Sequence, residues 1–130
     1  MQLSLWDLDW NKDFNYSDIW LQFEKNQCEF NFKESNPDNI RKLFSLYQEE
    51  ANSLVDKKLT FPALDFVLKC SHCFNLLDAR GVISVTDRAQ YIEKIRKLAK
   101  EVASSWIQER ESLNFPLLKK DFQFEKKSDK

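Results

Sequence analysis

The chain has 130 residues, of which 42% are hydrophobic and 32% charged, and its 20 basic and 21 acidic side chains give a formal net charge of −1. This length and composition fit a single ordinary domain with a real hydrophobic core. The balanced charge excludes a strongly basic nucleic-acid-binding protein, so any contact with nucleic acid must come from a local cluster. One glycine and three prolines favour helices joined by short connections, because hairpins and tight turns rely on glycine. We therefore expect an all-α fold.

The N-terminus lacks a basic segment followed by an apolar one, and no stretch approaches the length of apolar sequence that crosses a bilayer. We therefore expect neither secretion nor membrane insertion, and a cytoplasmic location.

Residues 1–32 are rich in aromatic side chains. We expect this segment to be mainly irregular, with a short helix from Ser17 or Asp18 to about Cys28. The rings form either an aromatic patch of the core or a surface that meets a partner domain missing from the chain. They are Trp6, Trp10, Phe14, Tyr16, Trp20, Phe23, Phe30 and Phe32.

Three amphipathic patterns predict a small bundle of three main helices, at about 36–57, 61–80 and 84–112. Asn36 is the expected N-cap of the first, and the only glycine, Gly81, is the expected C-terminal stop of the second. Ser84 and Asp87 have the spacing of a capping box at the start of the third. The second pattern is apolar around most of its circumference, so that helix should be central.

The segment Cys70-Ser71-His72-Cys73 invites a metal interpretation. On a helix, however, one ion cannot reach all three potential ligands, because His72 lies roughly 160° from Cys70. Only Cys28 could complete a four-ligand zinc site. We therefore expect no metal site, no disulfide in a reducing compartment, and cysteines that act as small core residues.

A polar row of Ser71, Asn75 and Asp78 falls inside the apolar arc of the second helix. Buried polar groups need partners, and Arg88, counted in the phase of the third helix, also falls on the buried side. We expect a buried, structural Asp78–Arg88 ion pair, since hydrogen-bonded pairing is how buried charge is tolerated.

Lys94, Lys97 and Lys100 lie three residues apart on the outward side of the third helix. They form either a solvated face with i,i+4 pairing or a ridge that contacts phosphates. Residues 119–130 are mostly charged and are expected to be a disordered tail.

The block from Ser71 to Arg88, S-H-C-F-N-L-L-D-A-R-G-V-I-S-V-T-D-R, resembles S-H-x-F-N-L-L-D-A-R-x-x-I-S-V-T-E-R of the glycyl-tRNA synthetase alpha subunit, of the bacterial two-subunit type. The resemblance covers residues 5–118 and includes Y-S-D-I, Q-C-x-F-N-F and R-E-S-L-N-F-P-L. The departures are mild. They are Ser17 and Asn114 where the family prefers glycine, Lys33 where it prefers Glu, and Asp87 for Glu.

This resemblance implies the C-terminal helical portion of the alpha subunit of a class II glycine–tRNA ligase. Residues 1–32 would link to a missing catalytic domain, and 33–118 would form the helical domain. The F-R-x-E-like and G-L-E-R-like motifs that bind ATP in class II synthetases do not occur in the sequence. ATP and Mg²⁺ would therefore serve the complete enzyme, with neither bound by this chain, and no catalytic residue is assigned. The implied partners are the beta subunit, a second alpha subunit and glycine tRNA.

His72, Phe74 and Tyr91 are also similar to positions in the helical region that follows the catalytic core of alanyl-tRNA synthetases, which meets the tRNA acceptor stem. By this likeness Arg80, Lys94, Lys97 and Lys100 are candidate tRNA-binding residues. The alternatives to an enzyme part are a separate helical tRNA-binding module and a protein-docking bundle without catalysis.

Overall fold

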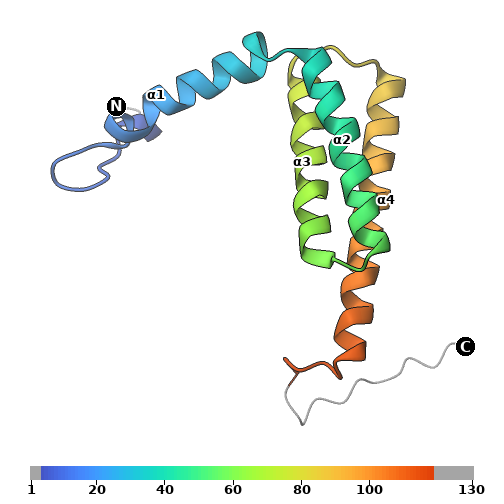
Figure 1. The fold of residues 1–130 in the computed structure, drawn as a ribbon. Helices are drawn as coiled ribbons and strands as arrows, with labels where there is room; N and C mark the ends of the chain where they lie inside the picture. Colours follow the sequence, from blue (N-terminus) through green and yellow to red (C-terminus); the bar gives the residue numbers. More distant parts are fainter. Residues whose placement is uncertain (1–3, 119–130) are drawn as a thin grey trace, which may run out of the picture.

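The computed structural model describes residues 4–118, which are helical for most of their length (Figure 1). Residues 4–118 contain no strand, only an isolated bridge between Asp9 and Asn15. The all-α expectation is confirmed, and the three main helices begin and end within about one residue of the predicted bounds. The expected tail, 119–130, lies outside the described residues. The elements are the 3₁₀ helix η1 (Leu5–Asp7), α1 (Tyr16–Glu29), the π-helix η2 (Phe30–Glu34), α2 (Pro37–Asp56), α3 (Thr60–Ala79) and α4 (Val85–Ser112).

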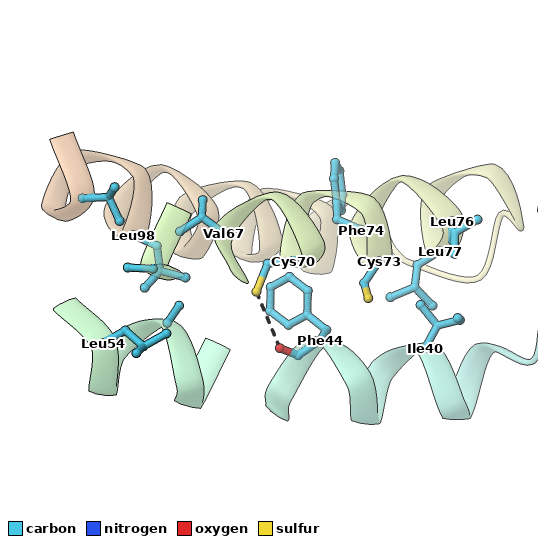
Figure 2. Close-up of a cluster of buried hydrophobic side chains, with 13 residues drawn as sticks. Ile40, Phe44, Leu54, Val67, Cys70, Cys73, Phe74, Leu76, Leu77 and Leu98 are labelled. Atoms are coloured by element: carbon cyan, nitrogen blue, oxygen red, sulfur yellow. Dashed lines mark hydrogen bonds between the residues drawn. The ribbon is translucent and has the colours of Figure 1, made fainter. Parts of the chain in front are cut away.

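Helices α2, α3 and α4 lie side by side as a bundle around one hydrophobic core (Figure 1). Helix α3 is central, as predicted, and supplies most of the buried side chains. Phe44 of α2 lies between Cys70 and Cys73 of α3 (Figure 2) and touches the Tyr91 ring of α4 edge-on at 4.7 Å between centroids. The buried hydrophobic residues are Ile40, Phe44, Ala51, Leu54, Ala63, Val67, Cys70, Cys73, Phe74, Leu76, Leu77, Leu98 and Val102.

The connections within the bundle are short because two helices end in the same hydrogen-bonded motif. After α3, Gly81 adopts φ +65° and its N–H donates to the Asp78 carbonyl, while the Val82 N–H donates to the Leu77 carbonyl. This is the Schellman pattern, and it confirms Gly81 as the C-terminal stop. Helix α2 ends in the same way with Lys58 at φ 57°, a conformation that glycine adopts more readily.

The helix starts were also largely predictable. Asn36 accepts hydrogen bonds from the Asp38 and Asn39 amides, so it is the N-cap of α2. Ser84 accepts from the Asp87 amide and caps α4. The reciprocal bond of a capping box is not formed at α4, whereas aspartates at the same position complete a capping box at η1 and at α1.

Residues 4–34 form an arm that extends away from the bundle (Figure 1). Its rings contact one another, with Trp10 5.8 Å from Tyr16 and 6.3 Å from Trp20 between centroids. No residue of η1 or α1 is buried. The interpretation of these rings as a patch of the core is therefore wrong. The expectation of a mainly irregular segment is also wrong, because η1, α1 and η2 make most of residues 4–32 helical and α1 is longer than expected.

Candidate functional site

Lys97 and Lys100 are the two sequence-predicted cations that the structure brings together. Both point outward from α4, and the Lys97 side chain is 76% exposed, with its Nζ 4.0 Å from Glu101 Oε1. A helix of 28 residues is a rigid rod of about 42 Å. It therefore fixes the backbone positions from which the two lysine side chains extend.

Two shallow grooves meet at these lysines. The first, of about 640 Å³, is lined by Ala89, Ile92, Glu93, Arg96, Lys97 and Lys100. The second, of about 470 Å³, runs toward the end of α2 and adds Lys58, with Asp56 and Glu101 as its acidic members. Four basic and three acidic side chains thus line the joined grooves.

Lys94 lies apart from that pair. It lines a third groove with Arg41 and Gln90, and its Nζ is 5.9 Å from the centroid of the Tyr91 ring. The three lysines therefore follow a spiral around α4, because a spacing of three residues falls short of a full helical turn. They do not form one straight ridge.

Arg80 lies neither with the Lys97 and Lys100 pair nor in the groove that Lys94 lines. Its Nε donates to the Ser35 carbonyl at 3.1 Å and its Nη1 to the Phe32 carbonyl at 3.1 Å. The guanidinium is thus bonded to the junction between the arm and the bundle.

The polar row of α3 faces solvent rather than the core. Ser71 is half-buried, and Asn75 and Asp78 are exposed. The expected ion pair forms, with Arg88 Nε 3.2 Å from Asp78 Oδ1, but the side chains are 53% and 40% exposed. Its predicted burial is therefore wrong. The reason is that α3 is apolar over so much of its circumference that its sequence does not show which part faces the other helices.

The cysteines divide into two kinds. Cys70 and Cys73 are buried, as expected, whereas Cys28 on α1 is exposed, which corrects the expectation that all three are core residues. Burial raises the pKa of the Cys70 thiol to about 11 and also raises the pKa of Cys73. Both buried thiols are therefore protonated at neutral pH and are poor nucleophiles or metal ligands. No group of three potential ligands converges within residues 4–118, and His72 is exposed.

An apolar groove of about 300 Å³ lies between the start of α3 and the second half of α4. Phe61, Leu64 and Trp106 line it and remain exposed. The last turns of α4 extend past the ends of α2 and α3 (Figure 1). The apolar stripe of α4 therefore continues beyond Val102, the last residue of this helix that is buried in the core.

Sequence reasoning missed two cations of the grooves, Arg96 and Lys58. Arg96 has a usable signal, because it lies four residues before Lys100 and thus on the same side of one helix. No sequence signal in α4 indicates Lys58, since only the packing of α2 against α4 brings this residue to the groove.

A family model described as the glycyl-tRNA synthetase alpha subunit matches residues 2–111. The match spans most of the chain, so this chain belongs to the glycyl-tRNA synthetase alpha subunit family, an aminoacyl-tRNA synthetase family. This confirms the resemblance inferred from the Ser71–Arg88 block. Among the described helices, none has the length and apolar character needed to cross a membrane.

Proposed function

We propose that this chain is the C-terminal helical part of the alpha subunit of a cytoplasmic glycine–tRNA ligase, and that it contacts the tRNA acceptor stem and docks to other parts of the enzyme. The match over residues 2–111 supports the enzyme family. ATP and Mg²⁺ belong to the complete enzyme in this proposal, and its partners are the beta subunit, a second alpha subunit and glycine tRNA. The chain itself supplies no group to glycine activation.

The observation that carries the tRNA contact is the position of Lys97 and Lys100 at the meeting point of two grooves on one rigid helix. A-form helices are recognised mainly through their shape, phosphates and 2′-hydroxyls. Such recognition needs cations that reach the phosphates and no base-specific side chains. Lys58 and Arg96 extend the cationic positions on either side of the pair.

Replacing both lysines tests this contact. The double variant Lys97→Gln/Lys100→Gln should weaken binding of glycine tRNA. The slope of log affinity against log salt should fall by about 1.4 to 1.8, because each of the two lost phosphate contacts contributes roughly 0.7–0.9. Fluorescence anisotropy with labelled tRNA over a salt series measures both quantities, using the complete enzyme with its beta subunit.

The matched control is Lys25→Gln/Lys42→Gln, which removes the same charge from exposed positions outside the grooves. It should leave the salt slope unchanged. Equal slopes in the wild type and in the Lys97/Lys100 variant would reject the phosphate contact and return these lysines to a solvated helix face.

Protein docking is a second candidate function, favoured by the exposed apolar groups. Trp10, Phe23 and Phe32 on the arm are each more than half exposed, and the groove beside Trp106 is almost wholly apolar. Large exposed apolar patches mark interaction surfaces. The bundle can contact tRNA and another protein together, because the cationic grooves and the aromatic arm occupy different parts of the molecule.

A further inference from the structure

The arm and the bundle are joined through a very short hinge. The π-helix η2 ends at Glu34, Ser35 is extended with ψ 134°, and Asn36 already caps α2. Between the arm and the bundle, the main packing is that of η2 on α3. Since η1 and α1 do not pack on the bundle, side-chain packing alone would hold the arm weakly.

Arg80 bonds to both sides of this hinge. Its two hydrogen bonds reach the Phe32 carbonyl inside η2 and the Ser35 carbonyl at the hinge itself. Arg80 is also the C-cap of α3, where its N–H donates to the Leu76 carbonyl at 3.0 Å. The side chain therefore leaves from a rigid point of the bundle and ends on the backbone of the arm.

The chemistry of the contact is favourable. The last carbonyls of a helix lack intrahelical donors, and they carry the negative end of the helix dipole. The Phe32 carbonyl is in this last turn, whereas the Ser35 carbonyl lies just past it. The guanidinium donates to both with N–H groups in a fixed planar arrangement, and its charge interacts well with the dipole. A π-turn such as η2 often marks a functional position in a helix.

We propose that Arg80 is a positioning residue that fixes the angle between the aromatic arm and the helical bundle. This assigns to Arg80 a contact with the chain's own backbone in place of the tRNA contact expected from the sequence. On the basis of the proposed function, the Arg80 contact also sets the angle between the arm surface that docks to protein and the grooves that face tRNA.

Distances between two spin labels test the angle directly. Cys28 is the exposed native cysteine of α1, whereas Cys70 and Cys73 are buried, so nitroxide labels go to Cys28 and to Asn52→Cys on the exposed side of α2. The labelled 130-residue chain should give a narrow distance distribution by pulsed electron paramagnetic resonance. Arg80→Met keeps the length of the side chain but removes its donors, and it should broaden the distribution.

Two further variants separate positioning from folding. Arg41→Met removes the 2.8 Å hydrogen bond from Nη2 to the Val82 carbonyl within the bundle, and it should not broaden the distribution. Arg80→Lys keeps the charge with a single donor group and should give an intermediate width. It also carries the test if circular dichroism shows that Arg80→Met does not fold. An unchanged width in the folded Arg80 variants would overturn the proposal.

Charging of tRNA by the complete enzyme then separates this inference from the proposed function. Misplacing the bundle should lower kcat/KM for tRNA in Arg80→Met by about 10-fold or more, because small displacements of bound groups have large effects on rate. A broadened distribution with unchanged charging would support the positioning role of Arg80 and count against the proposed tRNA contact of the bundle.

Discussion

The Asp78–Arg88 pair shows how exposure decides the value of a single contact. A buried ion pair that loses one partner costs several kcal/mol, because the other charge stays desolvated. Here both side chains are about half exposed, so water replaces the lost partner. Arg88 also lies over the Phe74 ring, with its Cζ 5.9 Å from the centroid, which gives it a packing role apart from its charge.

Asp78→Ala should therefore lower the free energy of unfolding by less than about 1 kcal/mol, as is typical of exposed pairs. Urea unfolding of Asp78→Ala, Arg88→Ala and the double variant measures the coupling between the two side chains and removes the contribution of Phe74. A coupling free energy near 3 kcal/mol between the two side chains would contradict the exposed geometry, because only a buried pair has so large a value.

At the scale of elements, α3 is the helix whose sequence is most easily misread. It buries Ala63, Val67, Cys70, Cys73 and Leu77. It also leaves Phe61, Leu64 and Leu68 exposed on another side, so its apolar residues do not mark a single face. The buried thiols are a more reliable marker of its inner side. Cys70 is fully buried, and its Sγ lies 3.8 Å from the Phe44 carbonyl (Figure 2).

The raised pKa of Cys70 predicts a loss of stability at high pH. Burial raises this pKa to about 11, so between about pH 9 and 11 the unfolded chain loses the thiol proton while the folded chain keeps it. The stability that the protonated Cys70 thiol contributes is therefore fully present below about pH 9. It is lost as the pH rises through about 11. The free energy of unfolding, measured from pH 7 to 11, should fall more steeply for the wild type than for Cys70→Ala.

Cys28→Ala is the control for this experiment, because its thiol is exposed and its curve should follow the wild type. Parallel curves for the wild type and Cys70→Ala would mean that the thiol ionises equally in the folded and unfolded chains.

At the scale of the whole molecule, the arm and the bundle differ in where they keep their apolar side chains. The bundle buries its core, whereas the arm keeps its rings exposed. Neither part contains the arginine motifs with which class II synthetases hold the phosphates of ATP. Stabilising charge on a reacting triphosphate needs such groups in place.

The purified chain should therefore show no glycine-dependent exchange of pyrophosphate into ATP, with or without the beta subunit. An intact two-subunit glycyl-tRNA synthetase assayed in parallel is the positive control. Exchange above background that follows the chain through purification would refute the proposal that this chain is a non-catalytic part of the enzyme.

The sequence by itself determined the three main helices, three of their end residues and the family. Asn36, Gly81 and Ser84 act through hydrogen bonds to neighbouring residues of the chain, so their roles follow from local sequence. The central position of α3 also followed, since a helix that is apolar around most of its circumference must be covered by others.

Tertiary structure alone decided the roles of Arg80, Lys58 and the arm. Arg80 bonds to carbonyls 45 and 48 residues away along the chain, and Lys58 reaches the α4 grooves only because α2 packs there. The solvent exposure of Asp78 depends on which side of α3 the other helices cover. The periodicity of apolar residues predicts which side of a helix is buried, but it does not indicate which neighbouring helix covers that side. Contacts between distant segments are therefore decided by packing.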